Sequence, residues 1–258
     1  MSVRAIELAQ RIDRLLSVDG HPDYPTALNG LQVDSRNPVR AIAAAVDASQ
    51  RSMLGAVDVG ANFLIVHHGL FWSGVQPLIG NAYQRLRYLF EHDIAVYASH
   101  LPLDAHPEFG NNALLAREFG LSPSRPFARF QGVPIGVAGD TDTPTDAILS
   151  LADAFARRHG GRARSSAMSQ GHRTRRWAIC TGAGASSDTL REAEAAGIDT
   201  LITGEGPHHT TVEAPERGVV VVYAGHYATE TLGVMAVAER IAGEAGVPWS
   251  FVDAPTGS

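Results

Sequence analysis

The stretch AIAAAVDASQRSMLGAVDVGANFLIVHHG at residues 41–69 decides the fold, because a second copy of it follows later in the chain. Residues 178–206, AICTGAGASSDTLREAEAAGIDTLITGEG, align with it without a gap at an offset of 137 positions. The residues that recur unchanged are Ala41, Ile42, Ala48, Ser49, Ala56, Gly60, Leu64, Ile65 and Gly69. Their matching order and spacing favour an internal duplication over chance similarity in a chain rich in alanine and glycine.

A second match between the two halves carries polar residues. The segments VYASHLPLD and VYAGHYATE align at an offset of 126 positions. This alignment sets His100 opposite His226, and it sets Asp104 opposite Glu230. The duplication therefore repeats a histidine and an acidic residue that are four positions apart, each time directly after an apolar run.

Each repeat predicts a strand, a helix after a turn, a second strand and, after a connection, a third strand. The predicted ranges are 41–47, 50–59, 62–66 and 94–98 in the first repeat, and 177–182, 188–196, 199–203 and 219–224 in the second. Continuous Val, Ile, Leu and Ala runs are typical of strands buried on both faces. We therefore predict an α/β fold of two similar α/β units, with sheets flanked by helices.

The predicted division of the chain follows from these repeats. The first α/β unit is expected at 1–125, packed with the C-terminal segment 222–258, and the second at 126–221. Two prolines and two serines in LSPSRPFARF, residues 121–130, predict a linker between them. Further helices are expected at the N-terminus, at 146–158 and at 228–244, and a short strand is expected in WSFVD.

Composition narrows the class of protein. The chain has 258 residues, of which 45% are hydrophobic and 19% charged, and no apolar run approaches the ~18 residues that span a bilayer. A globular cytoplasmic protein without a membrane partner is expected. All 21 positive residues are Arg, which excludes a P-loop lysine or a Schiff-base lysine. The net charge of −6 argues against nucleic acid as a partner, and the single Cys180 excludes a thiolate-rich zinc site.

Histidines and acids follow the ends of the predicted strands, where α/β proteins place their chemistry. His226 and Glu230 stand at helical i and i+4 positions and share one face, although Pro102 makes the same regular geometry doubtful between His100 and Asp104. The candidate metal ligands are His67, His68, Asp104, His226 and Glu230. Imidazole and carboxylate donors without thiolate suit Zn, Fe, Mn, Co or Ni, and their number suits two divalent ions per chain.

Structural explanations compete with this metal site. An isolated His-His pair or a lone His-x-x-x-Glu is usually a surface or core feature, but recurrence in both halves favours ligation. Glu205, His208 and His209 are predicted to support the site or bind substrate, with a structural loop as the alternative. The Arg-rich segment 157–176 is interpreted either as a solvated loop or as a grip on phosphate.

Five segments in order carry a resemblance to a known family: NGLQV, HHGLFW, YASHLPLD, ITGEGPHH and AGHYATE. Together they resemble the GTP cyclohydrolase 1 type 2-like, or Nif-three-like, dinuclear metal-centre family over nearly the whole chain. The resemblance implies metal ligation by the same five residues, two similar α/β domains and a toroidal homohexamer. The family's usual Trp-Asp-Asn before the Asn-Gly turn reads Thr26-Ala27-Leu28-Asn29 here, which leaves the role of this N-terminal segment open.

The first functional hypothesis is a metal-dependent hydrolase acting on a nucleotide or other phosphorylated small molecule. Glu230 is the candidate bridging carboxylate, and His100 is the candidate catalytic acid or base. The family name implies attack on the guanine ring of GTP, while similar proteins are also linked to phosphoester hydrolysis. The alternative is a non-catalytic, metal-binding oligomer with an interaction or regulatory role.

Overall fold

The computed structural model describes residues 2–257, which divide by their internal contacts into two units. Unit 1 comprises the residues up to 103 together with 233–254, and unit 2 comprises 104–232 together with the residues from 255 onward. These ranges differ from the predicted division in three places, at residues 104–125, at 222–232 and from 255 onward. The side chains of Leu115 and Phe119 pack into the same apolar cluster as Trp177, which ties the first of these segments to unit 2.

Unit 1 is built on a mostly parallel sheet with the strand order β1-β4-β3-β2-β11. β11, β2, β3 and β4 run parallel to one another, and within the described residues of this sheet only β1 is antiparallel, through its pairing with β4. The elements of this unit are α1 (Ala5–Leu16), β1 (Gly30–Val33), β2 (Ile42–Asp47), α2 (Gln50–Asp58), β3 (Phe63–His68), α3 (Gly80–Glu91), β4 (Ala95–Ala98), most of α10 (Thr231–Ala245) and β11 (Trp249–Phe251). The short helix α4 (Leu101–Asp104) follows β4 and ends at the boundary with unit 2.

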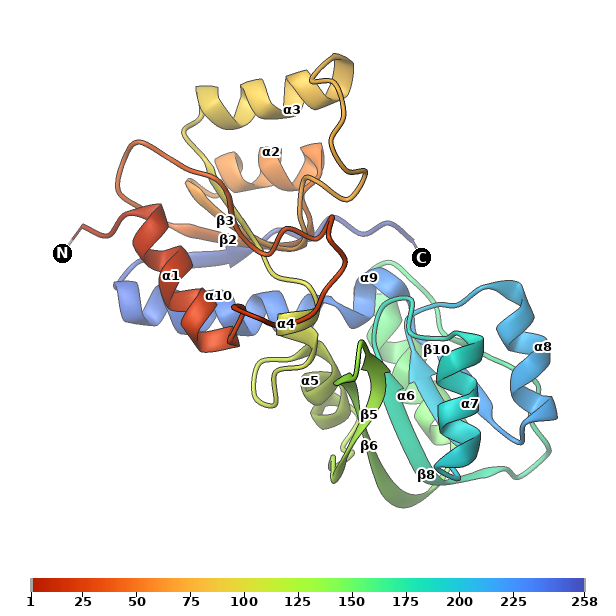
Figure 1. The fold of residues 1–258 in the computed structure, drawn as a ribbon. Helices are drawn as coiled ribbons and strands as arrows, with labels where there is room; N and C mark the ends of the chain where they lie inside the picture. The colour runs from red at the N-terminus through yellow and green to blue at the C-terminus, as the bar shows by residue number, and fades with distance from the viewer. Residues whose placement is uncertain (1, 258) are drawn as a thin grey trace. The chain divides into compact units, whose positions relative to one another are not determined.

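Helices cover both faces of the unit 1 sheet, as the uninterrupted apolar strands predict. Figure 1 shows α2 and α3 on one side of the strands, and α1 with α10 on the other. Met53 of α2 and Leu89 of α3 join the apolar cluster on the first face. On the second face, the buried Tyr97 of β4 donates a hydrogen bond of 2.8 Å to Asp13 of α1. Both faces of each central strand are therefore buried, which explains why polar residues appear only at the strand ends.

Unit 2 contains a mixed sheet with the strand order β5-β6-β8-β9-β10-β7. β8, β9 and β10 are parallel, and β5, β6 and β7 add antiparallel pairs at the edges. The elements are α5 (Asn111–Glu118), β5 (Arg125–Phe130), β6 (Val133–Pro144), α6 (Thr145–Arg158), β7 (Arg164–Ser165), β8 (Arg173–Cys180), α7 (Ser187–Ala195), β9 (Thr200–Thr203), α8 (His208–Glu216), β10 (Val220–Tyr223) and α9 (His226–Thr229).

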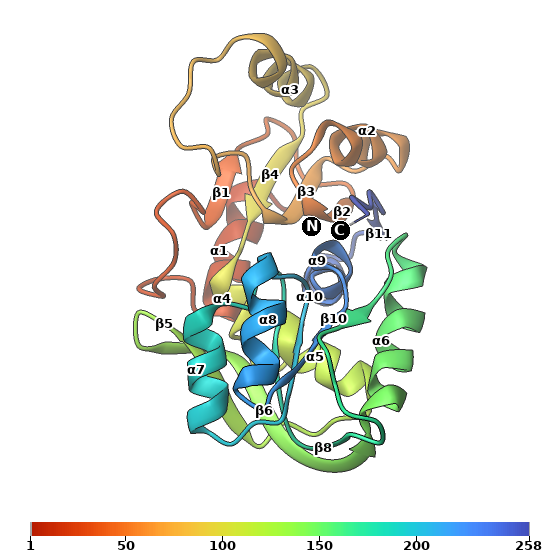
Figure 2. The same cartoon turned by 90° about the vertical axis from the view of Figure 1, so that its right-hand side faces the viewer.

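Alternate residues of β8 show how this sheet is covered. Trp177 and Ile179 pack with residues of α5 and α6, while Ala178 and Cys180 pack with residues of α7 and α8. Figure 2 shows α7 and α8 side by side, apart from α6. The period of two along the strand therefore separates two apolar layers, one on each face.

The two units repeat one topology, as the duplication predicts. In unit 1 the order β2, α2, β3, α3, β4 gives adjacent parallel strands, and in unit 2 the order β8, α7, β9, α8, β10 does the same. The prediction of two α/β units with sheets flanked by helices is confirmed.

Two local predictions need correction. The predicted linker at 121–130 contains β5, which pairs antiparallel with β6 and buries Phe127. Pro126 is tolerated because β5 is an edge strand, so one of its sides needs no ladder hydrogen bonds. The helix predicted at 228–244 is two helices, α9 and α10, with Glu230 at the junction.

The doubt over the segment after His100 is also resolved. Residues Leu101–Asp104 form the helix α4 although Pro102 lies within it. Proline is accepted in a first helical turn, where its missing N–H would have no intrahelical partner. Within the described residues, no helix is long and apolar enough to cross a membrane.

The core of unit 2 provides a test of the fold. Replacing Phe155 of α6, which is 2% exposed, by Ala should destabilise this unit by about 3–5 kcal/mol through lost burial and a residual cavity. Leu151→Ala is the matched control, because Leu151 lies on the same helix and is 45% exposed. Scanning calorimetry should show a much lower midpoint for Phe155→Ala alone, and equal shifts for both variants would contradict the packing.

Candidate metal centre

The histidines of unit 1 gather at the carboxyl ends of two neighbouring parallel strands. His67 and His68 end β3, and His100 follows the end of β4. The ring centroids lie 4.8 Å apart for His67 and His68, and 4.9 Å apart for His67 and His100. One ring nitrogen from each of these three residues lies within 4.8 Å of the others, so this cluster could hold a metal ion.

The two histidines of β3 are each oriented by an oxygen acceptor. The Nδ1 of the buried His67 lies 2.9 Å from the carbonyl oxygen of Ser99, and the Nδ1 of His68 lies 2.9 Å from Oδ1 of Asp47. Because these oxygens only accept, each Nδ1 carries the proton and each Nε2 keeps its lone pair. An acceptor behind the ring is the usual way in which proteins orient a metal-binding imidazole.

His100 is held more tightly than the other two, through its ring and its backbone. Its Nδ1 lies 2.8 Å from Oδ1 of Asp23, and its backbone N–H donates to Asn29 at 2.7 Å. The other oxygen of Asp23 accepts from the Asn29 amide and from the Leu101 backbone. Burial alone would raise the pKa of Asp23, but hydrogen bonds from His100, Asn29 and Leu101 lower it overall. The N-terminal segment, whose role the sequence left open, therefore positions His100.

Aromatic side chains lie against this histidine cluster. The Trp72 ring is edge-on to His100 at 4.7 Å and to His68 at 5.6 Å. Tyr24 lies 6.1 Å from Trp72 and 6.0 Å from His100. These rings give the imidazoles an apolar neighbour on one side, which limits the access of water.

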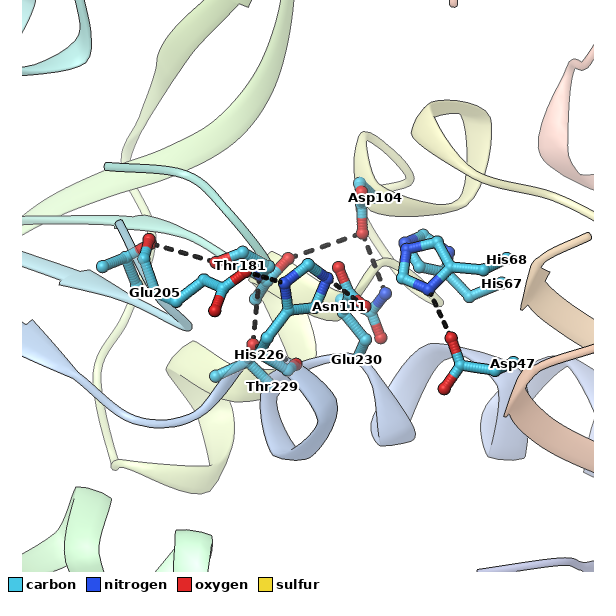
Figure 3. A network of polar contacts seen from close by, with 12 residues as sticks. Asp47, His67, His68, Asp104, Asn111, Thr181, Glu205, His226, Thr229 and Glu230 are labelled. Atoms are coloured by element: carbon cyan, nitrogen blue, oxygen red, sulfur yellow. Dashed lines mark hydrogen bonds and ion pairs between the residues drawn. The ribbon is translucent and has the colours of Figure 1, made fainter. Parts of the chain in front are cut away.

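Unit 2 brings together the remaining predicted ligands. Nε2 of His226, at the start of α9, lies 3.1 Å from Oε2 of Glu230. Its Nδ1 lies 2.8 Å from Oε1 of Glu205, which follows β9 (Figure 3). Burial disfavours the protonated ring, but Glu230 and Glu205 together raise the pKa of His226 to about 9. His226 is thus held between a buried carboxylate and a more exposed one.

The turn after β8 lies against both carboxylates of this group. Oδ1 of Asp104 accepts hydrogen bonds from Asn111 at 2.8 Å and from Thr181 at 3.4 Å (Figure 3). The next residue, Gly182, has no side chain, and a Cβ there would lie 2.1 Å from Oε1 of Glu230. Only glycine therefore allows the backbone to approach the Glu230 carboxylate this closely.

The donor set and its burial suit a cation. Glu230 is 2% exposed and Asp104 is 8% exposed, and a buried carboxylate is costly unless it is paired or coordinates a metal. The space left by Gly182 beside Glu230 and His226 acts as a cradle that any other residue would fill. The imidazoles of unit 1 could therefore hold a metal ion, and the imidazole and carboxylates of unit 2 are donors that suit the same class of cation.

Other histidines that the sequence groups near the site have different roles. His106 accepts hydrogen bonds from the backbones of Glu108 and Phe109, so it stabilises a turn. His208 and His209 are exposed in the first turn of α8. The segment GEGPHH contributes Glu205, whose side chain contacts the predicted ligand His226.

Sequence reasoning missed Asp23 and Asp47. Asp47 could have been found, because it ends β2 and pairs in register with His68 of the neighbouring strand. Asp23 gives no such signal, since it lies in an irregular segment 77 positions before His100.

The Arg-rich segment does not support a phosphate grip at this site. Arg175 lies near the start of β8, roughly 20 Å along the strand from Thr181 at its other end. Arg157 and Arg158 form ion pairs with Asp153 and Glu118 on exposed surface. The interpretation as solvated surface agrees better with these contacts.

Comparison with known proteins identifies close relatives over the full length. The profile of the family described as Duf34/NIF3 (NGG1p interacting factor 3) matches residues 3–256. A "GTP cyclohydrolase 1 type 2 homolog" of Halobacterium salinarum is 42% identical over 253 residues, covering 97% of this chain and 98% of the relative. One of Deinococcus radiodurans is 40% identical over 257 residues, covering 97% and 93%.

Solved structures agree with this assignment. The crystal structure of TTHA1606 from Thermus thermophilus is 36% identical, with a TM-score of 0.81 and coverage of 99% of this chain and 100% of that one. The structure titled protein ybgI, unknown function, is 35% identical with a TM-score of 0.88, covering 99% and 100%.

The contacts of His226 predict a measurable titration in the metal-free protein. The folded-state pKa of His226 is about 9 and exceeds the ordinary value of 6.5. The contacts of the protonated ring with Glu230 and Glu205 therefore stabilise the fold fully below pH 6.5, and this contribution is lost as the pH rises through 9. In protein freed of metal by a chelator, the imidazole resonances of His226 measured by NMR should titrate with a pKa of about 9. Glu205→Gln should lower the pKa of His226, whereas Glu216→Gln, on exposed α8 surface, should leave it unchanged. A pKa near 6.5 in the parent protein would contradict the described contacts.

Proposed function

The chain belongs to the Duf34/NIF3 family, and on this premise we propose that it is a dinuclear-metal-dependent hydrolase acting on a nucleotide or other phosphorylated small molecule. The observation that carries the proposal is the common orientation of His67, His68, His100 and His226. Each of these rings has an oxygen acceptor at Nδ1, which makes Nε2 the candidate ligand or proton-transfer atom. In His226, Nε2 also lies 3.1 Å from Oε2 of Glu230, so a bound cation would take the place of the proton between these two proposed ligands.

The proposed ligands come from both units. Unit 1 supplies imidazoles and unit 2 supplies a further imidazole and two carboxylates, giving the set His67, His68, Asp104, His226 and Glu230. Chain connectivity supports their joint use, because α4 carries Asp104 directly after His100 and α10 continues from Glu230 into unit 1. Glu230 is proposed as the carboxylate shared between the ions, and Zn, Fe, Mn, Co and Ni all suit this donor set.

Bound divalent cations would supply Lewis acidity and lower the pKa of a water molecule that they hold. The chain's own contribution is positioning and proton transfer. His100 is placed to give or take a proton at Nε2, since Asp23 fixes the proton on Nδ1 and stabilises a positive charge on the ring. Trp72 and Tyr24 limit water around His100.

The family resemblance also supports the proposal that the chain forms a toroidal homohexamer. Light scattering tests this proposal by measuring the mass of the particle in solution.

Metal content tests the ligand set. We expect up to two first-row ions per chain in the purified protein, measured by elemental analysis. Glu230→Gln should lose most of this metal, because the amide cannot supply the negative charge or bridge two ions. Glu239→Gln, on the exposed surface of α10, is the matched control and should keep its metal. Full occupancy in Glu230→Gln would exclude the proposed role of this carboxylate.

Turnover tests the role of His100. Metal-loaded protein is assayed on GTP, nucleoside monophosphates and bis(p-nitrophenyl) phosphate. In His100→Gln we expect kcat to fall by about a hundredfold or more while the metal content is retained, because proton transfer is lost. His92→Gln, an exposed residue after α3, should have parent activity. Metal loss in His100→Gln would make this residue a ligand instead, and absence of turnover in the parent on all substrates would favour the non-catalytic alternative.

A further inference from the structure

A cavity of about 340 Å³ in unit 1 lies between the loop after β3 and helix α3. Its walls are largely apolar and are formed mainly by Leu70, Phe71, Val75, Leu78, Ala82 and Leu86. Arg85 adds a cation to the same wall. Ser73 and Gln76 also line the cavity. A volume of this size and a mainly apolar lining with a few polar groups are typical of small-molecule sites.

Arg85 has no carboxylate partner among the ion pairs of the described residues. Its side chain is half-buried, and Nη1 makes only a long hydrogen bond of 3.5 Å to the carbonyl oxygen of Ala48. Arg87, two positions along α3, is exposed and forms an ion pair with Glu91 at 2.9 Å. A half-buried guanidinium without a counter-charge attracts an anion, and its planar donors match the oxygens of a phosphate.

The position of Arg85 connects the cavity to the histidine cluster. The backbone N–H of Ala48 donates to the carbonyl oxygen of His68 at 2.8 Å, and the Ala48 carbonyl accepts from Arg85. The cavity wall begins at Leu70 and Phe71, the second and third residues after His68. An anion at Arg85 would therefore lie at the strand ends that carry His68 and Asp47.

We propose that this cavity binds a small molecule with one phosphate group on an apolar organic body, with the phosphate held by Arg85 and the body in the apolar pocket. In taking this molecule as a substrate of the histidine cluster, the inference rests on the proposed function. A single guanidinium offsets the charge of about −1 on a phosphate diester, or at least half of the charge of about −1.5 to −2 on a monoester, but only a small part of the charge of a triphosphate. The cavity therefore selects a phosphate monoester or diester of an apolar group over GTP.

The charge in the wall favours a small anion over a protein partner as the occupant. Val75 and Leu78 of the wall expose 100% and 59% of their surface, and such residues also occur in contacts between proteins. An apolar protein contact would, however, leave the Arg85 guanidinium without a counter-charge, which is costly on burial. A small amphiphilic anion satisfies both the pocket and the cation.

Binding is tested on the full chain with probes that cannot be hydrolysed. The probes are 1-naphthylphosphonate and its neutral counterpart 1-naphthalenemethanol, titrated by calorimetry in the presence of chelator. We expect the phosphonate to bind at least about tenfold more tightly, because it adds charge-assisted hydrogen bonds to the apolar contact. GTP should compete poorly. Since neither metal nor turnover is needed, a failure of the proposed hydrolase activity leaves this result intact.

Three variants identify the residues responsible. Arg85→Gln should remove the preference for the phosphonate, and Arg87→Gln is the matched control that should retain it. Ala82→Phe should fill the cavity and weaken both probes by about tenfold or more, with its folding checked by calorimetry. Equal binding of the two probes to the parent, or an unchanged preference in Arg85→Gln, would overturn the proposal. A change of mass by light scattering in Ala82→Phe would assign the cavity to a protein contact and would also overturn it.

Discussion

The parallel alignment of neighbouring strands is the constraint on which the candidate site depends. Parallel strands end at the same edge of a sheet, so residues that follow β3 and β4 are brought together although they are distant in sequence. The strands themselves are buried on both faces and cannot carry polar side chains without partners. Imidazoles and carboxylates are therefore concentrated where each strand ends, and each of these groups must be oriented by a neighbouring acceptor or donor.

The duplication explains how the two units came to supply different donors from one framework. In the alignment at 137 positions, His68 corresponds to Glu205, and His67 corresponds to Gly204. Glu205 orients His226, so the second unit uses this position for the acceptor behind the ring and not for the ring itself. A Cβ at Gly204 would lie 2.7 Å from the His226 Cα, so glycine at this position allows α9 to pack against the strand end.

Much of this arrangement could be predicted from sequence because the informative signals are local or repeated. The buried strands, the duplication and the recurring histidine-to-acid spacing gave the α/β units and the candidate ligands. The partners of the histidines could not be predicted in the same way. Asp23 reaches His100 only after an irregular segment folds back, and the edge strand β5 forms at a proline-containing segment because Phe127 is buried there. The Asp23–His100 contact and the strand β5 both depend on tertiary contacts, which the spacing of apolar residues along the sequence does not predict.

Burial at the end of β8, next to the same carboxylates, determines the protonation state of the chain's cysteine. Cys180 ends β8 directly before the Thr181–Gly182 turn, and its side chain packs in the apolar cluster under α7. Burial raises the pKa of Cys180 to about 12, and the charges of Asp104, Glu192 and Glu230 act in the same direction. The thiol is therefore neutral at physiological pH and is neither a nucleophile nor a thiolate donor. Burial is the main reason that the thiol stays neutral, and the nearby carboxylates of Asp104 and Glu230 add to its effect. The donors at the end of β8 are therefore restricted to nitrogen and oxygen atoms.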